Sequence, residues 1–323
     1  MTHQTSFTHA EFAAKKKTTR REKFLSRMEE VIPWKPLLAV IGPHYPKGER
    51  GRPPVGLERM LRVYFLQQWY GLADEALEDA LYDSQALQGF ARIDLAAGGG
   101  PDATTLLNFR HLLETHDLCK GLFKAINTDL SAQGLLLRAG TLVDATLIAA
   151  PPSTKNAKKE RDPEMHQTQK GNPWYFGMKA HIGADRDTKR VHTVVVTAAK
   201  VADITKTAER LHGEEKQVHA DAGYTGVEKR GELVALERRI DWQIAGKRGG
   251  LKALAEGAEK EALKAIEQAK ASVRAFVEHP FHIVKHLFRH RQVRYRGRAK
   301  NGHQRYTLFG LANVVIGSRA AAT

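Results

Sequence analysis

The stretch Leu137–Ser153, LRAGTLVDATLIAAPPS, decides the fold of this chain. Leu142 and Val143 begin a buried strand, and a second apolar run follows at 147–150. Asp144 lies between the two apolar runs. Because an unpaired carboxylate is costly to remove from water, Asp144 requires a cation, a hydrogen-bond donor or water at the strand end. The pattern of this stretch leaves the three partners open.

The chain before this stretch shows helical spacing and no strand pattern. Apolar residues at helical spacing run over 55–69, and Gly71 ends that run. Further short helices are expected at 73–81 and within 102–126. Short helices around a glycine turn can include a helix-turn-helix, although any small helical bundle has the same pattern. We therefore expect an all-helical N-terminal domain over residues 1–135.

A basic run lies within the first 30 residues, most of which are polar. A loose arm on DNA phosphates and a solvated, disordered tail explain the run equally well. Its members are Lys15, Lys16, Lys17, Arg20, Arg21 and Lys23.

The pattern changes at Gly140, where strand signals begin. The order of elements predicts a mixed α/β sheet in which parallel strands are added to an antiparallel hairpin. An exposed loop is expected at 151–173 and an unstructured tail at 318–323. Strands are expected at 174–183, 191–197, 217–220 and 242–245, and helices at 204–211, 227–238 and 272–290, with a solvated helical insertion at about 249–268.

The overall charge points to the kind of partner. The 323-residue chain has a formal net charge of +15, which favours an extended polyanion such as DNA, although a ribosome-like or merely soluble basic protein has the same excess. Cys119 is the single cysteine, so an internal disulfide is excluded and a reducing cytosol fits. No apolar run reaches membrane-spanning length, so we expect a cytoplasmic protein with no membrane partner.

Three acidic residues stand at the ends of separate elements. Asp144 lies in the first strand, Asp221 ends another in VHADAGYTG, and Glu278 lies in the C-terminal helical segment. Carboxylates of this kind suit Mg²⁺ or Mn²⁺ rather than zinc. Two such ions can activate a water or a 3′-hydroxyl and stabilise the leaving oxygen in phosphodiester transfer. The pattern predicts a DNA-processing enzyme.

The helix around Glu278 adds two cations. Arg274 and Lys285 lie four residues before and seven after Glu278, near one helix face, where Arg274 can orient the carboxylate and Lys285 can meet a phosphate. From the spacing alone, an ordinary surface salt bridge between Arg274 and Glu278 is the preferred explanation. Pro280 predicts a kink just after Glu278.

Five stretches resemble a known family, in one consistent order over about residues 50–301. They are RGRPPVGLERMLRVYFLQQWYGLADEALEDALYDS, GTLVDATLIAAPPS, KGNPWYFGMKAHIGADRD, HADAGYTG and VEHPFHIVKHLFRHRQVRYRGRAKN. Together they resemble the DDE transposases of bacterial insertion sequences, most closely the IS-five family of the wider IS-four-like group. The resemblance implies a helical DNA-binding region over 1–135 with its basic arm, followed by an RNase H-like catalytic domain over 136–317.

The resemblance also implies site residues. The catalytic triad of the family falls on Asp144, Asp221 and Glu278, which would hold two Mg²⁺ ions, with Mn²⁺ as a substitute. A C-terminal signature of Tyr, Arg, Glu and Lys places its last three members on Arg274, Glu278 and Lys285. Ala271 stands at the tyrosine position, a departure from the family pattern. A homodimer in the bacterial cytoplasm, associated with the nucleoid, is implied as well.

Further residues are candidates for DNA contact, each with a structural alternative. Trp174 can stack on a base or pack into the core. Lys179 and His181 share one strand face, which either approaches DNA or is solvated, and Tyr224 follows Asp221. The densest basic cluster consists of Arg291, Arg294, Arg296, Arg298 and Lys300. His181, His192 and His219 fit no zinc spacing.

We therefore expect a transposase that cleaves the ends of an insertion sequence and joins their 3′-OH groups to target DNA. Its partners would be double-stranded DNA, both the terminal inverted repeats and the target. Two alternatives remain open. One is an RNase H-like nuclease without strand transfer, and the other is a non-catalytic DNA-binding relic. The presence of all three carboxylates favours an active enzyme over the relic.

Overall fold

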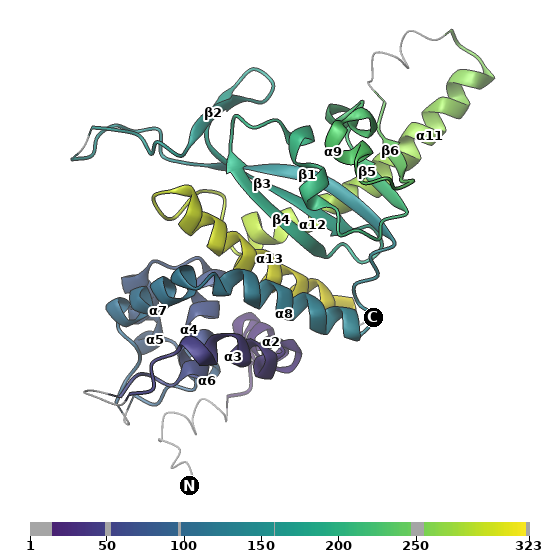
Figure 1. The fold of residues 1–323 in the computed structure, drawn as a ribbon. Coiled ribbons are helices and arrows are strands. Elements are labelled where there is room, and N and C mark those ends of the chain that lie inside the picture. Colours follow the sequence, from purple (N-terminus) through teal and green to yellow (C-terminus); the bar gives the residue numbers. More distant parts are fainter. Residues whose placement is uncertain (1–14, 49–52, 96–97, 158, 247–254, 321–323) are drawn as a thin grey trace. The chain divides into compact units, whose positions relative to one another are not determined.

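The computed structural model of the protein describes five ranges of residues, namely 15–48, 53–95, 98–157, 159–246 and 255–320. They fall into two compact units. The first unit extends to Ile126 and also takes in the chain from Gly317 onward, and the second spans Asn127–Ile316. The first is helical and the second contains a mixed sheet, as the predicted fold class requires (Figure 1).

The helical unit is organised around α4 (Leu57–Tyr70). Every residue of α4 from Met60 to Trp69 is buried, so this helix lies inside the bundle rather than on its surface. Gly71 ends α4 in the left-handed conformation, which a glycine adopts without strain. The other elements are α2 (Arg20–Val31), α3 (Trp34–Ile41), η1 (Gly42–His44), α5 (Asp74–Asp83), α6 (Gln85–Ala91), α7 (Ala103–Thr115) and the first part of α8 (Leu118–Ala132).

The basic run near the N-terminus is not a loose arm or a disordered tail from Arg20 onward, because α2 begins there. Thr19 accepts the backbone N–H of Glu22 at 3.2 Å, and the Glu22 carboxylate accepts the N–H of Thr19 at 2.7 Å, so the two form a capping box. Lys15 forms an ion pair with Glu22. Residues 1–14 lie outside the described residues.

The helix pair around Gly71 is a poor reader of DNA. α5 carries five carboxylates and neither lysine nor arginine in its sequence DEALEDALYD, so it repels phosphates. α4 is buried and cannot enter a groove. α2 carries several exposed cations, Arg20, Arg21, Lys23 and Arg27.

The second unit contains a six-stranded sheet of order β2-β3-β1-β5-β6, with β4 also paired to β3. β3 pairs antiparallel with β1, β2 and β4, while β5 pairs in parallel with β1 and β6. Without β2, three antiparallel strands continue into two parallel ones, which is the RNase H-like order. The strands are β1 (Gly140–Ala149), β2 (His166–Gln169), β3 (Trp174–Asp185), β4 (Val191–Ala198), β5 (Gln217–Ala220) and β6 (Asp241–Ile244).

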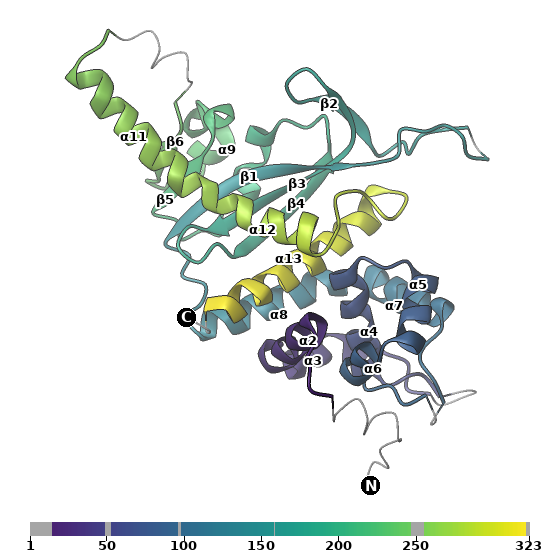
Figure 2. The same ribbon diagram turned by 180° about the vertical axis from the view of Figure 1, so that it is seen from behind.

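Helices and short turns cover both faces of this sheet. Figure 2 shows α11 (Ala258–Arg274) and α12 (Glu278–His282) across one face, which α13 (Arg298–Ala320) also covers. The other face packs on an apolar cluster that includes Val143, Val218 and Tyr224. Its short elements are η2 (Asp203–Lys206), η3 (Ala208–Arg210), η4 (Ala222–Tyr224), η5 (Val227–Lys229) and α9 (Gly231–Val234).

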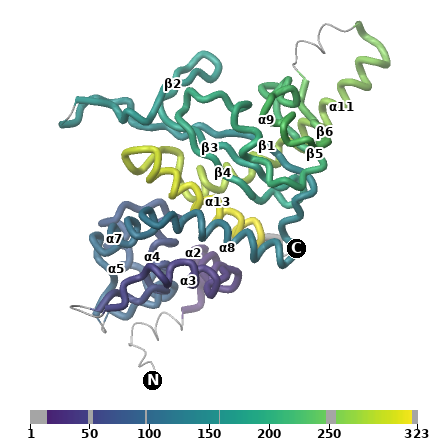
Figure 3. The backbone as a smooth tube through the Cα atoms, in the orientation of Figure 1, coloured from purple at the N-terminus to yellow at the C-terminus, as the bar shows by residue number. Residues whose placement is uncertain are grey.

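Several predicted elements differ from those observed. The exposed loop at 151–173 contains β2, an edge strand within a segment that projects from the sheet (Figure 3). The helices predicted at 204–211 and 227–238 are short 3₁₀ turns and a single α-turn, because their apolar residues pack into the cluster under the sheet. The prediction of an unstructured tail is wrong for Ser318–Ala320, because these residues belong to α13.

The predicted insertion at 249–268 falls within the described residues only from residue 255 onward. Residues 247–254 lie outside the described residues. α11 begins at Ala258 and continues to Arg274 without a buried residue. It therefore leads directly into the segment of Glu278 instead of ending before a separate helix at 272–290.

Candidate active site

Asp144 and Asp221 occupy matching positions on two neighbouring strands. β1 and β5 pair in parallel, with Leu142 opposite His219. Each aspartate follows one member of this pair by two residues, so both lie on the same face, toward the carboxyl ends of their strands. Such strand ends share one edge of an α/β sheet. The topology therefore brings the two aspartates to one place.

Each aspartate is held by a nearby backbone N–H group. Asp144 Oδ1 accepts the N–H of Ala145 at 2.7 Å. Asp221 caps η4, where its Oδ1 accepts the N–H of Gly223 at 2.9 Å. A Cβ at Gly223 would stand 3.0 Å from that oxygen, which explains the glycine. The sequence left open whether a cation, a hydrogen-bond donor or water is the partner of Asp144. One of its oxygens has a hydrogen-bond donor, the Ala145 N–H.

Glu278 reaches the site through a break in the helical segment. The chain narrows into a 3₁₀ turn, η6 (Ala275–Val277), which packs against β1 and buries Val277. α12 then begins at Glu278, whose side chain is exposed. Pro280 lies in the first turn of α12, where a missing N–H costs no hydrogen bond. The expected kink is thus a restart of the helix at Glu278.

The electrostatics of Asp144 reflect the other two carboxylates. Burial raises the pKa of Asp144 to about 6, and the charges of Asp221 and Glu278 raise it further, against the lowering effects of the Ala145 N–H and the Arg274 charge. Asp144 therefore interacts electrostatically with each of the other two carboxylates. No group of three His, Cys, Asp or Glu side chains within the described ranges is close enough together to hold a metal ion.

Arg274 and Lys285 lie on either side of Glu278 along the chain. Arg274 ends α11, and Lys285 lies in a π-helical turn, η7 (Ile283–Leu287). Among the described residues no ion pair joins Arg274 to Glu278, so the simple salt bridge is not formed, and Arg274 Nε is buried without a hydrogen-bond partner. Burial lowers the pKa of Lys285, which is half-buried, while the Glu278 charge raises it.

Two family models match the chain. The model described as "Transposase domain (DUF772)" matches residues 12–112, and the one described as "Transposase DDE domain" matches residues 136–314, more than half of the chain. The chain belongs to the DDE transposases. A solved structure, "Crystal structure of the Mos1 Strand Transfer Complex", is similar at 12% identity over 76% of this chain and 82% of that one, with a TM-score of 0.19.

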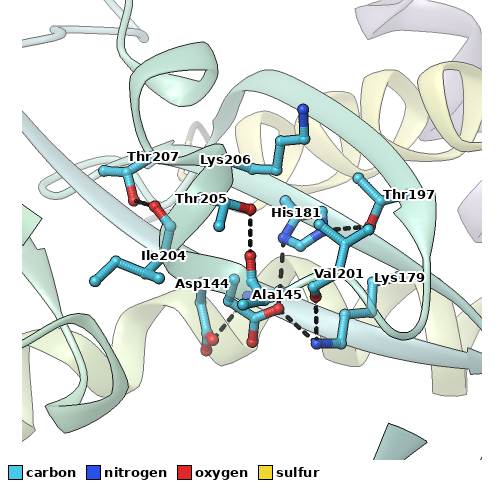
Figure 4. Close-up of polar contacts among 12 residues, drawn as sticks. Asp144, Ala145, Lys179, His181, Thr197, Val201, Ile204, Thr205, Lys206 and Thr207 are labelled. Atoms are coloured by element: carbon cyan, nitrogen blue, oxygen red, sulfur yellow. Dashed lines mark hydrogen bonds and ion pairs between the residues drawn. The ribbon is translucent and has the colours of Figure 1, made fainter. Parts of the chain in front are cut away.

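Three residues expected to contact DNA are internal parts of this transposase, and Figure 4 shows two of them, Lys179 and His181. His181 is fully buried on β3, and its ring shares a hydrogen bond with Thr197 at 2.7 Å. Lys179 donates to Asp203 at 2.9 Å, so this strand face is covered rather than solvated. Tyr224 is 1% exposed. Burial contradicts DNA contact by His181 and Tyr224, and Lys179 is committed to an internal ion pair.

The remaining candidates are accessible. Trp174 is 65% exposed at the start of β3, so the expectation that it packs into the core is wrong. The basic cluster is exposed throughout. It begins just before Gln292, which bridges to Ala149, and continues into the first turn of α13, with members Arg291, Arg294, Arg296, Arg298 and Lys300. None of the helices formed by the described residues is long and apolar enough to cross a membrane.

One buried residue beside Asp144 was not predicted from the sequence. Arg210 is 0% exposed and donates to the backbone carbonyl of Asp144 at 3.2 Å. Its sequence context, AERLHG, resembles a solvated helix, and no spacing links it to the triad. Only the pairing of β1 with its neighbours brings the two together.

Proposed function

We propose that this transposase cleaves the ends of an insertion sequence of the IS-five type and joins the freed 3′-OH groups to target DNA. The observation that carries the proposal is the matched placement of Asp144 and Asp221 on adjacent parallel strands, with Glu278 beginning α12 beside β1. The exposed basic cluster supports double-stranded DNA, both terminal inverted repeats and target, as the substrate.

Asp144, Asp221 and Glu278 would hold two divalent cations. The donor set fits Mg²⁺, with Mn²⁺ as a substitute, because it consists of carboxylate oxygens. The negative charges of Asp221 and Glu278 repel that of Asp144, and a bound cation would relieve this repulsion. When bound, the cations supply activation of the attacking water or 3′-hydroxyl and stabilisation of the leaving oxygen. Arg274 offsets the negative charge beside Asp144, and Lys285 offers an ammonium group to a DNA phosphate.

Further parts of the chain would bind the DNA. Trp174 presents an exposed ring on which an unpaired base can stack. The exposed cations of α2 would serve the helical N-terminal region in binding the element ends. A homodimer would place one active site on each end of the element, in the bacterial cytoplasm.

The test is Mg²⁺-dependent cleavage and strand transfer on a DNA fragment that carries the element's own paired ends. Wild type should cut and join, whereas Glu278→Gln should bind the DNA and do neither, because glutamine keeps the size but lacks the charge that holds a cation. Glu228→Gln is the matched control, since Glu228 is an exposed carboxylate on η5, outside the triad.

Two results would contradict the proposal. Cleavage without joined products from the paired-end substrate would indicate a nuclease. Full activity of Glu278→Gln would remove Glu278 from the metal site.

A further inference from the structure

Arg210 is a fully buried cation whose every donor is used. A guanidinium has five N–H donors in a rigid plane, and Arg210 makes five hydrogen bonds. Nη1 donates to the carbonyl of Asp144 at 3.2 Å and to the hydroxyl of Tyr224 at 2.9 Å. The others go to the carbonyls of Lys206 at 3.0 Å and Asp203 at 2.9 Å and to the hydroxyl of Thr207 at 3.1 Å.

The two hydrogen bonds of Nη1 connect the segment that carries Asp144 with the segment that carries Asp221. One acceptor is the backbone of Asp144 itself. The other is the hydroxyl oxygen of Tyr224, which lies three residues after Asp221 in η4, the turn that Asp221 caps. One nitrogen therefore bridges the strand that carries Asp144 and the turn that carries Asp221, from the sheet face opposite the carboxylates.

Packing keeps this bridge in place. Gly183 faces Asp144's neighbour Val143 across the β1–β3 ladder, and a Cβ there would stand 2.3 Å from the Arg210 carbonyl oxygen. The chain at Arg210 thus lies directly on β3. All of the acceptors of Arg210 are carbonyl or hydroxyl oxygens, and no ion pair within the described residues includes it. A salt bridge therefore does not account for the burial of Arg210. Burying a cation without a carboxylate partner is costly, so its five hydrogen bonds must offset the lost hydration.

We propose that Arg210 is a positioning residue that sets the separation of Asp144 and Asp221 for binding of divalent cations. The inference rests on the metal site proposed above. Arg210 touches neither cation nor DNA. It acts through the backbone of Asp144 and the hydroxyl of Tyr224, as residues that orient the ligands of a metal without touching it do.

The experiment measures Mn²⁺ binding to the full chain by electron paramagnetic resonance, together with the melting temperature. Arg210→Lys keeps the charge but loses the planar guanidinium that donates to Asp144 and Tyr224 together. It should weaken Mn²⁺ binding about tenfold or more. Arg62→Lys is the matched control, because Arg62 is an equally buried arginine, 1% exposed, within the helical unit. It should lower the melting temperature without changing Mn²⁺ binding.

A second variant keeps the inference testable if Arg210→Lys does not fold. Tyr224→Phe keeps the ring and removes only the hydroxyl acceptor, so it should weaken Mn²⁺ binding in the same direction by a smaller factor. Unchanged Mn²⁺ binding in folded Arg210→Lys, or in Tyr224→Phe if only that variant folds, would overturn the role of Arg210 and leave the metal site intact. Absence of Mn²⁺ binding by wild type would overturn the metal site itself, and this inference with it.

Discussion

Asp162 caps the basic helix α13 by accepting the backbone N–H of Gly297 at 2.6 Å. Glu164 accepts the next N–H, that of Arg298, at 2.7 Å. The projecting segment between β1 and β3 therefore holds the start of α13, where part of the basic cluster lies. Carboxylates stabilise a helix N-terminus by satisfying free N–H groups and by their charge.

Removal of this cap should loosen the basic cluster. We expect Asp162→Ala combined with Glu164→Ala to destabilise the fold by about 1–2 kcal/mol, in the range of a lost N-cap. Thermal unfolding followed by circular dichroism measures the change. Glu160→Ala, a neighbouring exposed carboxylate outside the cap, should leave the melting temperature unchanged. An equal melting temperature for the double variant and wild type would show that the contacts do not stabilise α13.

Asp144→Asn should make the metal-free protein more stable at alkaline pH. The pKa of Asp144 in the folded chain is raised from 3.8 to about 6, so the ionised form disfavours folding above pH 6 and this cost disappears as the pH falls toward 4. Asparagine stays neutral, and the gain at pH 8 is at most about 3 kcal/mol for two pKa units. Denaturant unfolding in a chelating buffer at pH 8 and pH 4 measures it. Asp79→Asn, at an exposed position, should show no such pH-dependent gain.

Cations of the basic cluster should contribute to DNA affinity without regard to sequence. Arg296→Ala and Arg298→Ala should each weaken binding and reduce the slope of log K against log salt by about 0.9, one phosphate contact each. Binding isotherms on double-stranded DNA at several salt concentrations measure the slope. Lys264→Ala on α11 is the control. An unchanged slope in both arginine variants would place the DNA elsewhere.

Trp174→Ala should reduce DNA binding and leave folding intact. The ring is 65% exposed, so little burial is lost on truncation. A lost base stack costs about 1–3 kcal/mol. Affinity for a substrate with unpaired terminal bases should fall more than affinity for a blunt duplex, which fluorescence anisotropy can measure. Equal losses on both substrates would contradict stacking.

Gly183→Ala should be strongly destabilising. A Cβ there would stand 2.3 Å from the Arg210 carbonyl oxygen and 2.6 Å from the His192 ring, so the Arg210 backbone and the His192 side chain would both have to move. We expect a loss of about 1–3 kcal/mol or more in chemical denaturation. Gly231→Ala meets nothing within 4 Å and should be neutral. A stable Gly183→Ala protein would indicate that the Arg210 segment can shift at low cost.

The strand around Asp144, the antiparallel hairpin after it and the helical character of the first unit were all predictable from the sequence, because each depends on local periodicity and turn chemistry. The sequence also indicated that Asp144, Asp221 and Glu278 belong to one site, through the strand-end positions of the aspartates and the resemblance of their flanking stretches. The burial of individual side chains could not be predicted from the sequence. Alternation along β3 defines two faces of the strand but does not tell which face another segment covers.

Roles that depend on segments distant in the chain became visible only when those segments were packed against one another. His181 and Lys179 are internal because the short turns after β4 cover their face of the sheet, and Tyr224 is internal because its own turn, η4, packs on that face. Trp174 lies on the opposite face by strand alternation, at the exposed start of β3. Arg210 meets Asp144 across 66 positions of sequence, through strand pairing that no local pattern encodes. The physical reason is that a buried polar group is satisfied by whichever segment the packing brings against it.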